Sequence, residues 1–293
     1  SEILETISKY RHDGVYIEWS VNEKAAMEVA AAAAYSGARA MVTMKQVGLN
    51  VAADPLMSLA YVGVKGGMVI VSADDPGPIS SQTEQDTRRF ADFCRIPVFD
   101  PSSPEEAYKM IGDAFEYSEK YNTPVLFRPT TRVCHAYASI DNCDSPSPKK
   151  YEGFVKDSKK WVIFPRLSFA NHIMIEKRNV EIGKDFSTYS ANKAEGVNSE
   201  KAVVTSGISY AYTKECLKDY PDVKLIKIAT AYPFPEDFVL SSLEGAKEVL
   251  CIEELSPFIE EQILKLAGKH GLQLKVSGKL DGKVQAGGEN STD

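Results

Sequence analysis

The segment of residues 21–78 constrains the fold of this chain more than any other part of the sequence. It opens with a polar pair, Asn22-Glu23, which precedes a run dense in alanine. Residues 38–43 and 68–72 are short apolar runs with the length of a buried strand, and an apolar helical stretch lies before each of them. This alternation is typical of an α/β domain with a parallel sheet. The alanine-rich helix either allows another backbone to approach closely, as in a subunit contact or beneath a flat cofactor, or is an ordinary buried helix.

The composition argues against several classes of protein. A chain of 293 residues corresponds to about two domains. Its net charge of -7 argues against a nucleic-acid-binding surface, which requires clustered Lys and Arg. No apolar run approaches the about 20 residues that span a bilayer, and no signal peptide is visible. We therefore expect a cytoplasmic protein that binds neither nucleic acid nor a membrane.

The chain lacks the common signatures of metal sites and of several enzyme classes. The five cysteines are scattered without a CxxC pair, which does not suggest a metal or iron–sulfur site and favours free thiols in a reducing compartment. The motifs GxGxxG, GxxxxGKS/T, HExxH and GxSxG are absent. We interpret the four isolated histidines as surface or hydrogen-bonded residues: His12, His135, His172 and His270.

Composition and periodicity divide the chain into four parts. Residues 145–150 are rich in Pro, Ser and Lys, which indicates a surface linker, and residues 168–192 have the sparse apolar periodicity of a long polar helix. Three strands then alternate with helices, as in a small doubly wound domain. The expected parts are a first domain over residues 1–145, a linker and long helix over residues 146–198, a second domain over residues 199–282, and a disordered tail over residues 283–293.

Both ends of the sequence suggest a portion of a longer chain. Helical periodicity begins with the first residues, where an α/β domain normally has a strand, and the last residues contain no apolar pattern. Within the first domain we also expect a strand at residues 15–19, a loop at residues 44–48, and a polar loop at residues 80–86. Loops of this kind on α/β scaffolds often carry function.

Residues 18–95 closely resemble the 2-oxoacid:ferredoxin oxidoreductases that use thiamine diphosphate. The family pattern NExxAxxxAxGAxxxGxRA is met from Asn22 to Ala40, and the pattern DxPGPxSSxxEQD by residues 74–86. The similarity extends over nearly the whole chain, and within the family it is closest to alpha subunits of the indolepyruvate type. The resemblance implies two doubly wound α/β domains, namely a thiamine diphosphate-binding pyrimidine-type fold and a transketolase C-terminal-like domain.

The resemblance also implies an activity and partners. The intact enzyme would oxidatively decarboxylate an aryl 2-oxoacid such as indolepyruvate, transfer the acyl group to coenzyme A and pass electrons to ferredoxin. A beta subunit would complete it, and we expect a dimer. One alternative is a pyruvate or 2-oxoglutarate ferredoxin oxidoreductase, from which residues 44–47 depart. The other is a non-catalytic interaction module that kept this fold.

Five residues match the cofactor site of that family. Glu23 corresponds to a glutamate that hydrogen-bonds a ring nitrogen of the aminopyrimidine, so that the pyrimidine can remove the thiazolium proton. The physical alternative is a first-turn glutamate that stabilises the helix dipole. Asn22, Lys45 and Gln46 are expected to hold the cofactor or the substrate carboxylate, although a solvated loop lysine is an alternative for Lys45. Gly48 is expected to serve the backbone turn.

The resemblance places the remaining cofactor chemistry outside this chain. The family's diphosphate domain carries a GDG sequence that helps to hold Mg²⁺, whereas Gly112-Asp113-Ala114 lies here in a helical pattern without the second glycine. The CxxCxxC ligands of 4Fe-4S clusters are missing as well. We therefore expect no metal ligand in this chain, and thiamine diphosphate and Mg²⁺ shared with another domain. The isolated chain is expected to bind thiamine diphosphate weakly or not at all.

Overall fold

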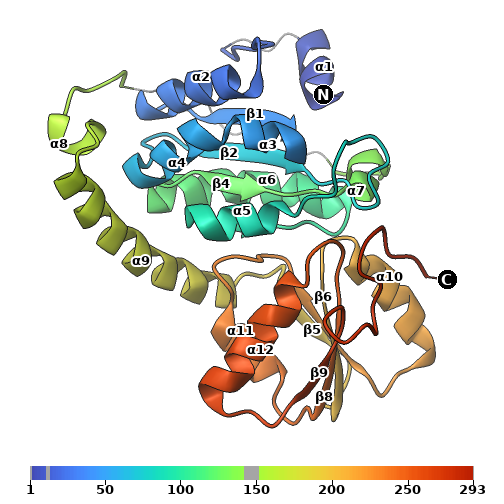
Figure 1. Cartoon of the computed structure of the whole chain (residues 1–293). Coiled ribbons are helices and arrows are strands. Elements are labelled where there is room, and N and C mark those ends of the chain that lie inside the picture. The colour runs from blue at the N-terminus through green and yellow to red at the C-terminus, as the bar shows by residue number, and fades with distance from the viewer. Residues whose placement is uncertain (1, 11–13, 142–151, 293) are drawn as a thin grey trace.

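The computed structural model describes residues 2–10, 14–141 and 152–292. Figure 1 shows two α/β units, one above the other, with a long helix that runs down one side of the first unit to the second. That helix is α9 (Pro165–Ser187), and the short α8 (Ser158–Trp161) precedes it. The linker expected at residues 145–150 lies outside the described residues. The expected α/β class with parallel sheets is confirmed.

The first unit is built on a four-stranded sheet whose pairs are all parallel, in the order β1-β2-β4-β3. The central strand β2 is buried over five of its six residues, as expected for a strand covered by helices on both faces. In chain order the elements of this unit are α1 (Glu2–Lys9), α2 (Glu23–Tyr35), β1 (Ala40–Lys45), α3 (Gln46–Val51), α4 (Ala53–Val62), β2 (Met68–Ala73), α5 (Thr87–Cys94), β3 (Val98–Phe99), α6 (Pro104–Tyr121), β4 (Val125–Phe127) and α7 (Thr131–His135).

The second unit has a five-stranded sheet in the order β5-β7-β6-β8-β9, with β5 as an antiparallel edge strand. The sequence analysis predicted the three central strands but neither edge strand, because each edge strand has only three residues and little apolar content. The elements are β5 (Lys193–Glu195), β6 (Lys201–Ser206), α10 (Ser209–Cys216), the 3₁₀ helix η1 (Leu217–Asp219), β7 (Lys224–Ile228), α11 (Glu236–Ser242), β8 (Glu248–Ile252), α12 (Phe258–His270) and β9 (Lys275–Ser277).

The alanine-rich helix forms as the sequence predicts. The Asn22 side chain accepts a hydrogen bond of 2.9 Å from the backbone N–H of Ala25, which caps α2, and alanine has the highest helix propensity. Its buried residues Met27, Ala31 and Ala34 recur at helical spacing and pack into the core of the first unit. One face of α2 therefore packs into the core, whereas Ala32 on the other face is exposed.

Two local predictions are wrong. Residues 15–19 form no strand; the side chains of Val15, Tyr16 and Trp19 are exposed, and no described strand pairs with this segment. Residues 44–48 are not a loop either, because β1 continues through Lys45 and α3 begins at Gln46. The glycine at position 48 suggested a turn, but it lies inside a helix, where it is needed for close packing.

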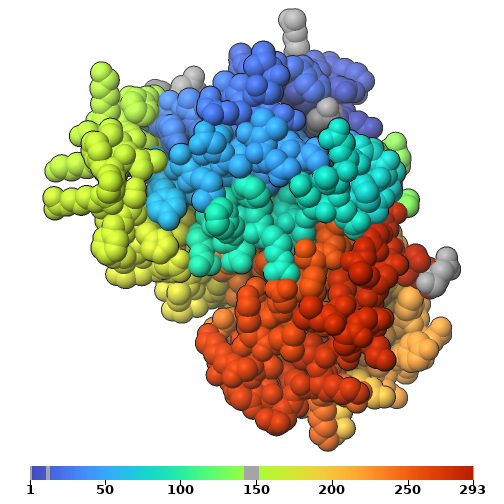
Figure 2. Space-filling model, viewed as in Figure 1, coloured from blue at the N-terminus to red at the C-terminus, as the bar shows by residue number. Residues whose placement is uncertain are grey.

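The C-terminal residues differ from the expected disordered tail. Residues 284–292 form no helix or strand, but they lie against both units (Figure 2). The backbone N–H of Gly288 donates to Glu84 (2.8 Å), and that of Asn290 donates to Glu254 (3.1 Å). Glu289 pairs with Arg132 at 2.5 Å. Polar composition did not reveal these contacts because they join residues far apart in the sequence.

In the described part of the chain, no helix is both long and apolar enough to cross a membrane. The longest helix, α9, instead packs its apolar side against the protein. Its buried residue Phe186 lies in an aromatic cluster with Phe99 and Tyr117, with ring centroids 5.4 and 5.2 Å away. This cluster fixes the C-terminal end of α9 to the first unit.

Candidate functional site

Glu23 is the first residue of α2, and its half-buried side chain lies against α3. Gly48 of α3 lies so close that a Cβ atom built on it would be 2.8 Å from Cγ and 2.9 Å from Oε1 of Glu23. Any other residue at position 48 would therefore displace the carboxylate. Among the described residues, no side chain or backbone group forms a hydrogen bond or ion pair with the Glu23 carboxylate.

Asn22 is the N-cap residue of α2 in the structure. Its side-chain oxygen accepts the hydrogen bond that caps α2, so this oxygen is occupied within the helix. The cap fixes the first turn, and with it the backbone of Glu23. The contact of Asn22 with a cofactor stays a prediction.

Lys45 and Gln46 lie at the junction of β1 and α3 and reach the polar loop of residues 80–86. The Lys45 ammonium donates to the backbone oxygen (3.0 Å) and the hydroxyl (2.8 Å) of Ser80. The buried Gln46 amide donates to the backbone oxygen of Thr83 at 3.0 Å. Both residues hold this loop in place beside α3, the helix that faces Glu23.

Asp75 fixes the start of the same loop. Its carboxylate accepts hydrogen bonds from the backbone N–H of Ser80 (2.9 Å) and the hydroxyl of Thr131 (2.8 Å). Burial favours the neutral acid, but these hydrogen bonds outweigh it and hold the pKa of Asp75 below its usual value. The carboxylate is therefore charged at neutral pH and anchors the loop.

A buried ionic network, which the sequence does not reveal, lies at the junction of the two units. Arg88 is fully buried and donates to Asp86 (2.6 Å), to Glu253 (2.8 Å) and to the hydroxyl of Ser206 (3.1 Å). Burial alone would raise the pKa of Asp86, but the Arg88 guanidinium lowers it to about 2. Because Glu253 follows Arg88 by 165 positions, sequence spacing gives no sign of this contact.

A second buried arginine completes this network on the side of the first unit. Arg128 donates to Asp74 at 2.7 Å and to Asp100 at 3.2 Å. Burial raises the pKa of Asp74 to about 6 despite the attraction of Arg128. Asp74, Asp100 and Arg128 follow the carboxyl ends of strands β2, β3 and β4, where side chains of a parallel sheet converge.

The site around Glu23 can accept one hydrogen bond from a ligand, but it offers no metal centre. Within residues 2–10, 14–141 and 152–292 there is no group of three His, Cys, Asp or Glu side chains that could hold a metal ion. The Glu23 carboxylate, which has no partner among the described residues, can accept a hydrogen bond from an N–H of a nitrogen heterocycle.

A family model and several relatives match this chain over much of its length. A family model described as pyruvate flavodoxin/ferredoxin oxidoreductase, thiamine diphosphate-binding, matches residues 1–198. The indolepyruvate oxidoreductase subunit IorA of Methanothermobacter thermautotrophicus is 42% identical over 275 residues, which cover 92% of this chain and 44% of that protein. The IorA subunit of Thermococcus kodakarensis is 41% identical, over 95% of this chain and 44% of its own length. The chain thus spans less than half the length of these relatives.

Two solved structures share the fold. A 2-oxoglutarate:ferredoxin oxidoreductase from Magnetococcus marinus has a TM-score of 0.66 at 16% identity, over 90% of this chain and 54% of that chain. A split-gene transketolase, described as an inactive beta4 tetramer, has a TM-score of 0.58 at 13% identity, over 89% of this chain and 73% of that chain. Both likenesses support a fold of two α/β units.

Proposed function

The chain belongs to the thiamine diphosphate-binding family of pyruvate flavodoxin/ferredoxin oxidoreductases, and from this we propose that it supplies the pyrimidine side of the cofactor site in an indolepyruvate ferredoxin oxidoreductase. The substrate assignment rests on the IorA subunits, which are about 40% identical over most of this chain. The enzyme would convert an aryl 2-oxoacid to an acyl-CoA and pass electrons to ferredoxin.

The observation that carries this proposal is the unpaired carboxylate of Glu23 beside Gly48. Thiamine diphosphate, when bound, supplies the carbanion chemistry that decarboxylates 2-oxoacids. Glu23 would hold the proton of a pyrimidine ring nitrogen in a hydrogen bond, which increases the basicity of the ring. Gly48 leaves room for that carboxylate, and Lys45 and Gln46 hold the loop of residues 80–86 beside α3.

The proposal assigns the other cofactors and partners to the rest of the enzyme. The described residues contain no metal-binding cluster, so Mg²⁺ with the diphosphate, and the 4Fe-4S clusters, would be held outside this chain. A beta subunit, coenzyme A and ferredoxin are the expected partners, and association as a dimer would complete the shared site. The proposed location is the cytoplasm, since the described cysteines are free thiols.

The test uses the full-length enzyme with its partner subunit under anaerobic conditions. Viologen reduction with indolepyruvate is compared for the wild type and for Glu23→Gln, which keeps the shape of the side chain but removes its charge. We expect a rate loss of about a hundredfold or more, as for a lost acid–base contact. Glu28→Gln on the exposed side of the same helix is the matched control and should keep the wild-type rate.

An unchanged rate in Glu23→Gln would contradict the proposed role. Glu23 would then only stabilise the dipole of α2, a contribution of about 0.3–1 kcal/mol. If the wild type reduces viologen with pyruvate or 2-oxoglutarate but not with indolepyruvate, the family remains and the substrate assignment is wrong.

A second measurement concerns the chain by itself. We expect titration calorimetry to show weak or no binding of thiamine diphosphate, because this chain would supply only the pyrimidine contact. Binding with a micromolar Kd would show that the isolated chain holds the cofactor without its partner.

A further inference from the structure

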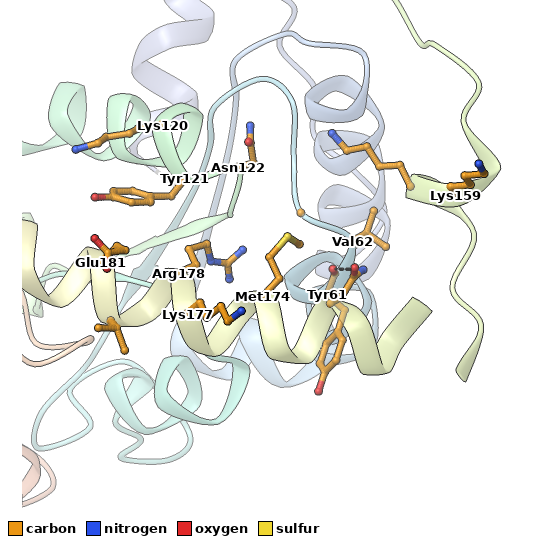
Figure 3. Close-up of a pocket in the computed structure, with 14 residues that line it drawn as sticks. Tyr61, Val62, Lys120, Tyr121, Asn122, Lys159, Met174, Lys177, Arg178 and Glu181 are labelled. Atoms are coloured by element: carbon orange, nitrogen blue, oxygen red, sulfur yellow. Dashed lines mark hydrogen bonds between the residues drawn. The ribbon is translucent and has the colours of Figure 1, made fainter. Parts of the chain in front are cut away.

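A groove that contains none of the residues discussed above lies between α9 and the C-terminal ends of α4 and α6 (Figure 3). Its volume is about 820 Å³, which is in the usual range for a small-molecule site. The groove is lined on one side by Tyr61, Val62 and Gly63, on another by Tyr121 and Asn122, and along its floor by α9.

The groove is a basic region on an acidic protein. Its lining includes five cationic side chains and one carboxylate, that of Glu181, whereas the whole chain has a net charge of -7. Glu181 pairs with Lys184, and Lys120 pairs with Asp185. In the described part of the chain the remaining four cations have no ion-pair partner: Lys159, Lys160, Lys177 and Arg178.

Arg178 is the residue that distinguishes this groove from a surface patch of lysines. Its Nε and Nη2 atoms are fully buried and have no hydrogen-bond partner among the described residues. Burial lowers the pKa of this guanidinium to about 10, so it remains charged at neutral pH.

The two unpartnered donors lie on the same edge of the guanidinium. This edge binds carboxylates and phosphates through two parallel N–H···O bonds. Figure 3 shows Arg178 and Met174 rising from α9 into the space below Asn122. Both donors lack accessible surface, so an oxyanion in the groove would satisfy them only after the guanidinium turns towards it.

We propose that this groove binds a small phosphorylated organic anion. The phosphate would lie on Arg178 and Lys177, because several neighbouring cations favour a multiply charged group. The organic part would lie against the apolar and aromatic wall formed by Tyr61, Val62 and Met174. This site is separate from the proposed cofactor site and does not depend on it.

The test is titration calorimetry on the full-length enzyme with its partner subunit, kept saturated with thiamine diphosphate and Mg²⁺. The probes are pyrophosphate and ADP, and we expect ADP to bind more tightly because its nucleoside adds apolar contact. Arg178→Gln should weaken both by about tenfold or more, the effect of losing about 1.4 kcal/mol. Arg166→Gln removes the same charge from an exposed position of α9 outside the groove and should leave binding unchanged.

A second variant keeps the test valid if Arg178→Gln does not fold. Met174→Trp retains every charge but fills the groove from an exposed position, and it should abolish ADP binding. Equal losses in the Arg166 and Arg178 variants, unchanged binding in Met174→Trp, or no binding of either probe would overturn the proposal. So would binding of a polyglutamate peptide at this site in place of both phosphates, because it would identify a protein partner.

Discussion

Gly48 influences the site because it has no Cβ atom. The Glu23 carboxylate fills the space where any larger residue at position 48 would place its Cβ atom. The added Cβ would clash with Cγ and Oε1 of Glu23. A larger residue at position 48 would therefore push the carboxylate away from its present position. The residue that sequence analysis assigned to a turn is thus a determinant of where the proposed catalytic group lies.

We predict that Gly48→Ala lowers turnover by roughly tenfold to a hundredfold, because displacement of a catalytic group by about 1 Å has effects of that size. Overpacking should also lower the free energy of unfolding by about 1–3 kcal/mol. The measurements are viologen reduction by the full-length enzyme and urea denaturation.

Gly112→Ala is the matched control for that substitution. Gly112 lies inside α6, and nothing lies within 4 Å of an added Cβ. The same change should there raise the free energy of unfolding by about 0.5–1 kcal/mol, because alanine is the better helix former. Full turnover in Gly48→Ala would show that catalysis does not depend on the position that Gly48 gives the Glu23 carboxylate.

At the level of elements, α5 carries two adjacent arginines with very different surroundings. Arg88 is buried in the network between the units, whereas Arg89 pairs at 2.5 Å with Glu261, and both of these side chains are about one-third exposed. A buried charge left without its partner is costly, while a solvated ion pair contributes little.

We therefore predict that Arg88→Gln lowers the free energy of unfolding by about 3–5 kcal/mol, since it leaves Asp86 and Glu253 buried without their cation. Arg89→Gln should lower it by no more than about 1 kcal/mol. Urea denaturation measures the free energy of unfolding of both variants, whose changes lie next to each other in the same helix. Similar losses would show that the buried network is not a main support of the junction.

The order and type of the main elements could be predicted because helical and strand periodicity are local. The polar pair that precedes the alanine run marks the start of α2, which begins at Glu23. The edge strands β5 and β9 were missed because a three-residue strand is defined by its neighbour rather than by its own sequence. Residues 15–19 alternate like a strand but have no described partner.

The candidate site could be predicted only in part, for the same physical reason. The polar pair that opens α2 and the glycine of α3 were visible as residues, but their contact depends on how two helices pack. The unpaired Arg178 gave no signal, because a charged residue on a polar helix normally faces solvent. Burial and pairing over long separations are properties of the folded chain, and local patterns do not contain them.

At the scale of the whole molecule, Glu254 lies where the second unit meets the C-terminal residues. Its carboxylate accepts a hydrogen bond from the backbone N–H of Asn290, and burial raises its pKa to about 7. In the unfolded chain the same group titrates near 4.5. Between these values the folded protein binds the additional proton, so this group lowers the stability as the pH rises from about 4.5 to about 7.

We predict that Glu254→Gln removes this loss. The variant should be more stable than the wild type above pH 7, by roughly 3 kcal/mol, and the difference should shrink towards pH 5. Glutamine retains an oxygen for the Asn290 N–H, so the contact itself is kept. Urea denaturation of both proteins at pH 5 and pH 8 measures the change. A stability difference that grows towards acid pH would contradict a raised pKa of Glu254.

The long helix α9 has a mechanical consequence for the whole molecule. Its 23 residues span about 34 Å at 1.5 Å per residue. Asn171 donates to the backbone of Tyr61 in the first unit (2.9 Å), and Asn179 donates to the Tyr232 hydroxyl in the second (3.2 Å). Because the same rigid helix is hydrogen-bonded to both units, it limits how far the two units can move relative to one another.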